Sequence, residues 1–303
     1  MNPCIDKSCT TSGIIPDKKL RCTSPTYEPG GGGLNVSRAI QKLGGSSVAI
    51  YPAGGHTGQF LCELAATHEL ISKVVPIKES TRENFIVYDT EAAQEFRFGM
   101  PGPSISEDEW QQLISLIRNE KADFVVVSGS IPTGVPFRIF AELGAICRDS
   151  GSKLIVDTSG EALVQVAAAG AYLLKPNLLE LAALAGVPEV GVGQVQEVAR
   201  NVIATGKCEI IIVSLGPDGA MMVTKDDVIH IVPPPVIQNS TVGAGDSMVG
   251  GFVLSLSRGE DLRSSLQFGV ACGTAAIMTS GSELCRPEDV HEILTAIKKQ
   301  DKS

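Results

Sequence analysis

An octapeptide in the last third of the chain carries the clearest candidate chemistry. It reads Ser-Thr-Val-Gly-Ala-Gly-Asp-Ser over residues 240–247 and runs directly into small residues that predict a helix. The first N–H groups of a helix are unpaired and lie at its positive end, so they can bind a phosphate. The same field favours ionised Asp246, which can accept a hydroxyl proton while the N–H groups stabilise a transferring phosphoryl group. The pattern indicates a kinase, although a helix start after a tight glycine turn would also account for it.

A second glycine loop lies near the amino end. Four consecutive glycines, residues 30–33, precede a helix start at Leu34. Backbone without side chains can approach a ligand closely, but a plain flexible turn explains the run equally well. Neither loop satisfies the dinucleotide motif Gly-x-Gly-x-x-Gly, because Met248 occupies its last position in the later loop. The Gly206-Lys207 pair does not form a Walker A motif either, so a nucleotide must bind in another way.

Composition excludes several classes of function. The chain has 303 residues, of which 43% are apolar and 19% charged, as expected of a folded globular protein. Its net charge of −9 argues against a nucleic-acid partner, and no apolar run approaches the ~18 residues of a membrane span. The four histidines and eight cysteines lack the spacing of zinc sites, and no signal peptide is recognisable. We expect a cytoplasmic protein with reduced thiols and without nucleic-acid or membrane partners.

The elements that must position these loops follow from the hydrophobic pattern. From about residue 105, helical periods alternate with short β-branched runs, which predicts an α/β fold with a buried, mostly parallel sheet. The predicted strands lie at 124–127, 154–156, 172–174 and 210–213, with a hairpin of 220–223 against 228–231; helices are predicted near 106–118, 135–149, from 177, 194–205, 244–257, 261–279 and 287–299.

Two segments do not follow this alternation of helices and strands. Their patterns predict β structure outside the main sheet. They are residues about 10–29 and a hairpin of 84–88 against 95–98. Strands inserted between the early elements of a sheet indicate a small lid, which we place at about 8–29 and 83–100. The whole chain, 1–303, is then one α/β domain with an inserted β lid.

Three ordered blocks resemble the ribokinase/PfkB family of carbohydrate kinases. They are Gly-Gly-Gly-Gly-Leu-Asn at 30–35, Lys-Pro-Asn-Leu-Leu-Glu at 175–180, and Thr-Val-Gly-Ala-Gly-Asp-Ser at 241–247. Within that family, segments 19–23, 28–30, 51–55 and 232–236 are most similar to the minor, PfkB-type ATP-dependent 6-phosphofructokinases. The resemblance covers nearly the whole chain and implies a ribokinase-like fold.

The resemblance also implies a reaction. It would transfer the γ-phosphoryl group of ATP to the 1-hydroxyl of fructose 6-phosphate, as in glycolysis, giving fructose 1,6-bisphosphate and ADP. The alternatives are a 1-phosphofructokinase or a tagatose-6-phosphate kinase, which usually carry Gly-Lys-Gly-Ile-Asn at the sugar loop, where this chain has Gly32 in place of the lysine. A third alternative is a non-catalytic sugar-phosphate sensor, which would be expected to lack the base or the metal pair.

Residue roles follow from the same resemblance. Asp246 would be the catalytic base, and the anion hole would be formed by Gly243, Ala244 and Gly245. The sugar phosphate would contact Asp246 and Asp6, Lys19, Gly31, Gly32, Asn35, Arg82 and Ser130, with Lys19 able to reach a neighbouring subunit. ATP would contact Lys175, Asn177, Ser214, Gly216, Gly219, Ser240, Gly243 and Gly245.

Metal sites and assembly are implied in the same way. Mg2+ would be placed by Asn177 and Glu180, and K+ by backbone carbonyl groups at Ser240, Val242, Ala276 and Gly281. Read without the resemblance, Asn177 is a helix N-cap with Glu180 as its capping partner, and Gly216 to Gly219 form a β-turn. The exposed edges of the lid strands predict a homodimer formed through the lid.

The amino end departs from the family pattern. Relatives usually carry an apolar strand before the Asn-Pro-x-x-Asp segment, whereas here Met1 directly precedes Asn2 and Pro3. We therefore expect either a start that lies further upstream or a gap in the sheet beside Asp6.

Overall fold

The centre of the molecule is a six-stranded sheet in a computed structural model that describes residues 1–167 and 170–301. Its order is β12-β11-β10-β9-β8-β7, and β7 to β10 run parallel, while β10 to β12 are antiparallel. The strands are β7 (Phe124–Ser128), β8 (Lys153–Asp157), β9 (Ala171–Leu174), β10 (Cys208–Ser214), β11 (Ala220–Val223) and β12 (Val228–Ile231). The predicted α/β fold with a mostly parallel sheet is confirmed.

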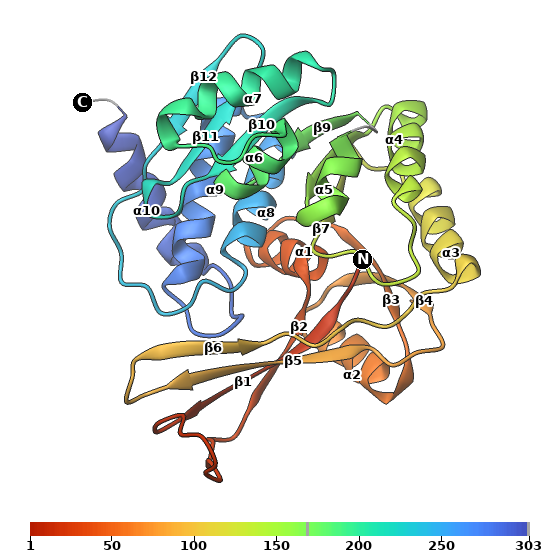
Figure 1. The fold of residues 1–303 in the computed structure, drawn as a ribbon, viewed down its shortest axis with the longest axis vertical. Helices are drawn as coiled ribbons and strands as arrows, with labels where there is room; N and C mark the ends of the chain where they lie inside the picture. The colour runs from red at the N-terminus through yellow and green to blue at the C-terminus, as the bar shows by residue number, and fades with distance from the viewer. Residues whose placement is uncertain (168–169, 302–303) are drawn as a thin grey trace.

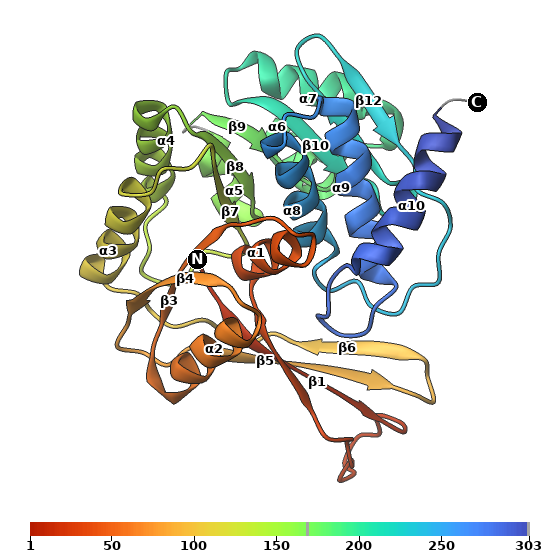
Figure 2. The ribbon, with the colours of Figure 1, turned by 180° about the vertical axis from the view of Figure 1, so that it is seen from behind.

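Helices cover both faces of this sheet (Figures 1 and 2). One layer holds α1 (Gly32–Lys42), α8 (Ala244–Ser257), α9 (Leu262–Ile277) and α10 (Pro287–Gln300). The other holds α3 (Glu107–Arg118), α4 (Arg138–Ser150), α5 (Gly160–Ala167), α6 (Leu178–Ala185) and α7 (Val195–Ala204). The strands are apolar at successive positions because each face needs a core: in β8, Leu154 and Val156 pack on the second layer and Ile155 on the first.

A separate four-stranded sheet projects from this body (Figure 1). Its order is β2-β1-β5-β6, formed by β1 (Cys4–Thr11), β2 (Thr26–Gly30), β5 (Arg82–Asp89) and β6 (Gln94–Phe98). We call it the lid sheet, or lid, because its strands lie largely in the two segments predicted to form one, although its first strand begins at Cys4 rather than at residue 8. The strand starts earlier because Cys4, Ile5 and Asp6 are buried at the base of the lid, where it joins the body. Most of the stretch between Thr11 and Thr26 is not in a strand.

A third, two-stranded sheet was not predicted from the sequence. It consists of β3 (Val48–Ala53) and β4 (Ile71–Pro76), which are parallel and connected by α2 (Gly55–Thr67). Neither strand pairs with the six-stranded sheet, whose last strand on that side is β7. The sheet layer is therefore interrupted between β7 and β3. Within the described part of the chain, no helix has the length and apolar character needed to cross a membrane.

Candidate active site

Polar residues gather at the carboxyl ends of the central parallel strands. Ser128 ends β7, Asp157 ends β8, Lys175 directly follows β9, and Ser214 ends β10. Open α/β sheets bind ligands at this edge, because loops and helix N-termini meet there. The sugar loop and the octapeptide loop start α1 and α8 at the same edge, so the two glycine loops of the sequence lie together.

Asp246 is held by two hydrogen bonds from residues far away in the sequence. Ser128 Oγ donates to Oδ1 at 2.9 Å, and Asn35 Nδ2 donates to Oδ2 at 3.0 Å. Each carboxylate oxygen thus has one donor and keeps a further lone pair for a proton or a hydroxyl group. The side chain is fixed in position before any substrate arrives, as general-base catalysis requires.

The surroundings of Asp246 tune its acidity. Burial, assisted by the nearby Asp157 carboxylate, raises the pKa of Asp246 to about 6, although the Asn35, Ser128 and Lys175 contacts oppose the rise. Lys175 Nζ lies 3.1 Å from Asp157 Oδ1. Burial alone would lower the pKa of Lys175, but the neighbouring carboxylates outweigh it and raise that pKa. The site therefore holds a permanent cation beside a base that is mostly ionised at pH 7.

The residues predicted to form an anion hole lie at the start of α8. Gly243 caps the helix in a left-handed conformation, with φ of +71°, and Ser247 N donates the first helical hydrogen bond to its carbonyl oxygen at 2.8 Å. The N–H groups of Ala244, Gly245 and Asp246 precede that bond and stay available to a ligand. A Cβ atom on Gly245 would lie 3.4 Å from Lys175 Nζ, so the ammonium group adjoins the same helix end. The two together make a site for a multiply charged anion.

The sugar loop requires glycine at its centre. Gly31 has a φ of +98°, and a Cβ atom on it would lie 2.9 Å from Pro3 Cα. A Cβ atom on Gly32 would lie 2.3 Å from Ser128 Oγ, the hydroxyl group that holds the base. A side chain on Gly31 or Gly32 would displace Pro3 or Ser128, so this part of the loop is fixed by close backbone contact rather than flexible.

The base of the lid supplies the polar groups opposite this loop. Asp6 is buried and accepts hydrogen bonds from Cys4 Sγ and Asn84 Nδ2, both at 3.2 Å. Burial raises the pKa of the Cys4 thiol well above its usual range, which keeps it a neutral donor. Asp6 and Asn84 are paired across the parallel strands β1 and β5, so the lid sheet holds their side chains next to each other.

The remaining predicted sugar contacts differ in position. Arg82 donates to the carbonyl oxygens of Asn2 at 2.9 Å and Met100 at 3.1 Å, and Asn2 Nδ2 donates to Ser130 Oγ at 3.0 Å. Arg82 and Ser130 are thus both linked to Asn2, next to the sugar loop. Lys19 is exposed on the loop between β1 and β2, at the outer end of the lid (Figure 1). The chain does not bring Lys19 to its own site.

Several of the predicted nucleotide contacts lie on the adjoining segments that follow β9 and β10. Asn177 caps α6: Glu180 N donates to its Oδ1 at 2.9 Å, and Asn177 N donates to Glu180 Oε2 at 2.8 Å. Ser214 N donates to the carbonyl oxygen of Pro176 at 3.0 Å, which joins the ends of β9 and β10. Gly216 to Asp218 form a 3-10 turn with positive φ at Gly216 and at Gly219 beyond it, so the turn interpretation of this segment is correct.

Neither predicted metal site is a dense cluster of ligands. Among the described residues, no group of three or more His, Cys, Asp or Glu side chains is placed to hold a metal ion. Asn177 and Glu180 offer side-chain oxygens and are partly open to solvent, which suits Mg2+ because this ion keeps several waters. At the predicted K+ site, Ser240 N donates to Ile277 O at 3.3 Å, which brings the segment of Ser240 and Val242 next to the end of α9, where Ala276 and Gly281 lie. The Ala276 carbonyl oxygen already accepts a hydrogen bond from Thr279 Oγ1 at 2.8 Å.

Sequence reasoning missed two residues of the site. Ser128 and Asp157 both directly follow a predicted buried strand, and a polar residue at that place is a signal that could have identified them. A further contact comes from the exposed Arg97, whose Nη2 donates a hydrogen bond to Thr241 Oγ1 in the octapeptide loop. The lid strand β6 therefore contacts the catalytic loop directly.

Comparison with known proteins gives the same picture. Residues 1–289 match the family described as pfkB family carbohydrate kinase. The chain is 42% identical over 299 residues to ATP-dependent 6-phosphofructokinase isozyme 2 of Escherichia coli, covering 98% of this chain and 97% of that protein. It is 30% identical over 304 residues to the 1-phosphofructokinase of Borreliella burgdorferi, covering 99% of this chain and 97% of that one.

Solved structures agree closely with the fold. The phosphofructokinase-2 of Escherichia coli in complex with substrates and products has a TM-score of 0.94, with 41% identity and coverage of 98% of this chain and 97% of that chain. Two further structures of that enzyme, one with potassium and one in a tetrameric inhibited form, give TM-scores of 0.94 and 0.92 at the same identity and coverage.

Proposed function

The chain belongs to the pfkB family of carbohydrate kinases, and from that premise we propose that it is an ATP-dependent 6-phosphofructokinase. It has a ribokinase-like α/β fold and is a phosphotransferase with a hydroxyl group as acceptor. The proposed reaction transfers the γ-phosphoryl group of ATP to the 1-hydroxyl of fructose 6-phosphate.

The observation that carries the proposal is the position of Asp246 between the two substrate regions. Asn35 and Ser128, from the sugar side, hold its two oxygens, and Asp246 is itself the last residue of α8 whose N–H group stays free. A base and an anion hole on adjacent atoms are what in-line phosphoryl transfer needs. A sensor that only binds sugar phosphate would not need a buried carboxylate with two fixed donors.

The step can be written with all atoms accounted for. The 1-hydroxyl oxygen attacks the γ-phosphorus of ATP and its proton passes to a carboxylate oxygen of Asp246. A new O–P bond forms while the bond from the γ-phosphorus to the β–γ bridging oxygen breaks, and ADP leaves. The α8 N–H groups and Lys175 Nζ bear the charge that spreads over the transferring group.

Mg2+ fits this scheme through Asn177 and Glu180, whose oxygens would hold it mainly through water. When bound, it would neutralise charge on the β- and γ-phosphates of ATP. The solved Escherichia coli enzyme with potassium supports a K+ site formed by Ser240, Val242, Ala276 and Gly281. The nucleotide would extend from Lys175 over Ser214, Gly216 and Gly219.

The identity of the sugar follows from the loop at Gly32. A lysine at this position, as in the 1-phosphofructokinase and tagatose-6-phosphate kinase pattern, would place its Cβ atom against Ser128 Oγ. The higher identity to the 6-phosphofructokinase relative, 42% against 30%, points the same way. Arg82 and Ser130 would bind the sugar phosphate after small movements from their present partners, and Asp6 the sugar hydroxyl groups.

We further propose that residues 1–303 act as one kinase domain, with the lid at about 8–29 and 83–100. Two copies would pair through the lid and bring Lys19 of one subunit toward the site of the other. The tetrameric form of the Escherichia coli enzyme supports an oligomer. A sugar-phosphate kinase of this kind would work in the cytoplasm.

The deciding experiment measures ADP release from Mg-ATP with fructose 6-phosphate, fructose 1-phosphate and tagatose 6-phosphate, each with and without K+. The highest kcat/KM for fructose 6-phosphate is expected. Preference for another sugar would refute the assigned substrate and keep the chemistry, whereas ligand-induced thermal stabilisation without ADP release from any of them would favour the sensor.

A further inference from the structure

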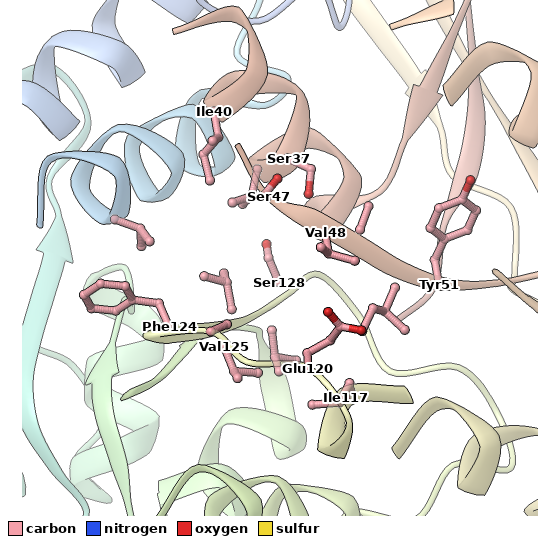
Figure 3. Close-up of a pocket in the computed structure, with 18 of the residues that line it drawn as sticks. Ser37, Ile40, Ser47, Val48, Tyr51, Ile117, Glu120, Phe124, Val125 and Ser128 are labelled. Atoms are coloured by element: carbon pink, nitrogen blue, oxygen red, sulfur yellow. The ribbon is translucent and has the colours of Figure 1, made fainter. Parts of the chain in front are cut away.

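The helix α1 presents two different faces to the rest of the molecule. Successive residues of a helix are rotated by about 100°, so side chains three or four positions apart share a face. Ser37 and Ile40 lie on one face and line a cavity between β7 and β3 (Figure 3). Asn35, Arg38 and Lys42 lie on the opposite face. An amide and two cations therefore point away from the cavity, toward the base, the lid and the loop after α9.

Arg38 is a cation with its side chain completely buried. Its Nη2 forms an ion pair with Glu28 Oε2 at 2.6 Å. Its Nη1 donates to the carbonyl oxygens of Ser282 at 2.9 Å and Pro29 at 3.1 Å, and to Asn35 Oδ1 at 3.4 Å. Its Nε has no hydrogen-bond partner within the described part of the chain. A buried cation with an unpaired N–H group is costly, so stability alone does not account for an arginine here.

The contact with Arg38 determines which way the Asn35 amide faces. A guanidinium group has donors and no acceptor, so the amide atom next to it must be the oxygen. The Nδ2 group then points to the other side, where it donates to Asp246 Oδ2 at 3.0 Å. A reversed amide would place N–H groups against the cation and its oxygen against the carboxylate, and both contacts are repulsive. The orientation thus follows from the chemistry of the guanidinium group, although the 3.4 Å contact itself is long.

Arg38 also connects this amide to the lid. Glu28 and Pro29 belong to β2, and Glu28 is paired with Asp6 of β1. Ser282 Oγ donates to Glu28 Oε2 as well, at 3.2 Å. The guanidinium group therefore lies where a lid strand, α1 and the loop after α9 meet. Its shortest contact is the charge-assisted one to Glu28, so a displacement of β2 would act on Arg38 first.

Other ionisable groups lie near Arg38 without holding the amide. Lys42, on the same face of α1, donates to the carbonyl oxygen of Glu283, in the same loop as the Arg38 contact. Burial, assisted by Arg38, lowers the pKa of His68. Neither group has a hydrogen bond to Asn35 among the described residues. Lys42 is therefore a suitable control for Arg38, because it is a cation that binds the same loop from the same helix.

We propose that Arg38 is a positioning residue for the reaction, which holds the Asn35 amide with its N–H2 group on Asp246 and makes this orientation depend on the lid strand β2. The role of Asp246 as base rests on the proposed function, whereas the chain of contacts from Glu28 through Arg38 and Asn35 to the carboxylate does not. Without Arg38 the amide is free to turn, and the ionised carboxylate loses a donor. The pKa of Asp246 should then rise further.

The test removes the guanidinium group together with the charge that balances it. Arg38→Met/Glu28→Gln eliminates both members of the ion pair, so no buried charge is left unpaired. Glu28→Gln alone is the matched control, because it keeps Arg38 and its contact with the amide, and Lys42→Met is the second control. Arg38→Lys is a further variant that keeps the charge, but its single nitrogen cannot serve the separate partners of Nη1 and Nη2. The Arg38→Met/Glu28→Gln pair is also made together with Asn35→Ala, which leaves no amide to orient.

The main readout is the titration of the Asp246 carboxyl group itself. It is followed by carbon NMR spectroscopy in protein labelled at the aspartate carboxyl carbons, and Asp246→Asn identifies the signal. Because the signal belongs to this carboxyl group, the titration of His68 cannot be mistaken for it. The midpoint is expected to rise by about half to one pH unit in both Arg38 variants and to stay unchanged in both controls. In the ADP-release assay, kcat of the Arg38 variants should fall about tenfold with little change in KM for Mg-ATP.

Four results would decide the matter. An unchanged midpoint in both Arg38 variants would overturn the proposal, as would an equal rise in Lys42→Met, which would indicate a general effect of charge. A rise of the same size in the Asn35→Ala background would also overturn it, because Arg38 would then act on Asp246 without the amide. A midpoint that rises only when Asn35 is present, in a protein that releases no ADP with any sugar phosphate, would keep the contact chain and refute the proposed function instead.

Discussion

Replacing the proposed base by its amide, Asp246→Asn, should abolish most of the activity and stabilise the protein at the same time. A general base contributes ~10²–10⁴ to the rate, so kcat should fall by about that factor. The gain in stability follows from the environment that makes the residue a useful base. Burial and Asp157 disfavour the ionised carboxylate in the folded state, and asparagine is never ionised.

The size of this gain can be worked from the raised pKa. The pKa rises from 3.8 to about 6, a difference of about two, which corresponds to about 3 kcal/mol. Because the folded state binds the proton more tightly than the unfolded state, wild-type stability falls as pH rises from 3.8 and levels off above the folded pKa. Of this loss, about 2 kcal/mol has occurred by pH 5.5 and the last ~1 kcal/mol follows by pH 8.

Asparagine also loses part of the hydrogen bonding. Its Nδ2 replaces an oxygen that accepted from Ser128 or Asn35, at a cost of about 1 kcal/mol. This cost is the same at both pH values. The free energy of unfolding of the variant should therefore exceed that of the wild type, by an amount about 1 kcal/mol greater at pH 8 than at pH 5.5.

Urea unfolding at the two pH values, together with the ADP-release assay, measures both effects. Both values lie above the isoelectric point near 5.0, which limits association of the neutral protein. Substantial turnover by the variant would refute the role of Asp246. A stability difference that is the same at pH 5.5 and pH 8 would refute the account of its environment.

Three further predictions concern the residues around the base. Ser128→Ala removes a hydrogen bond to the ionised base and should raise the pH at which kcat/KM falls on the acid side by about half to one pH unit. Asp157→Asn removes a neighbouring carboxylate and should lower that pH. Shifts of the same sign would contradict this, and measuring each shift relative to wild type removes the contribution of substrate ionisation. Gly32→Ala should lower kcat/KM by about 100-fold, because it displaces Ser128. The control Gly33→Ala should keep a kcat/KM close to that of the wild type, because its Cβ atom would meet only a carbonyl oxygen at 4.0 Å. Equal losses in the two variants would show that the contact with Ser128 is unimportant. Glu180→Gln keeps the side-chain oxygen that caps α6 but removes its negative charge. The KM for Mg-ATP should therefore rise about tenfold while the melting temperature stays unchanged. An unchanged KM would show that this residue is not part of the metal site.

The parts of the site that the sequence predicts are those encoded locally. A glycine turn followed by Asp246 and a run of small residues defines a helix start within eight positions, and α8 begins at Ala244 as expected. The capping pair of Asn177 and Glu180 is equally local, and the structure contains both of its hydrogen bonds. The central sheet could be predicted for the same reason. Each strand and each helix has its own characteristic spacing of apolar residues, which can be recognised within that segment alone.

The parts that the sequence does not predict depend on distant contacts or weak patterns. Ser128 lies 118 positions from Asp246, so their hydrogen bond cannot be read from spacing. The strand β4 has one buried residue in six and shows neither alternation nor a buried run, and β3 contains Pro52, which usually argues against a strand. Arg97 resembles any exposed arginine until the lid strand places it over Thr241.

The strand β1 connects the outer end of the lid to the predicted sugar-binding residues at its base. Asp6 lies at its inner end and Thr11 at its outer end, five residues or about 17 Å further on. Along this whole length β1 is paired with β5, from Cys4 opposite Arg82 to Thr11 opposite Asp89. A paired strand is stiff, so a tilt imposed on the outer end of the lid would be transmitted to Asp6 and Arg82 together. Whatever binds the far end of this sheet would therefore move both residues of the proposed sugar-phosphate site without contacting them.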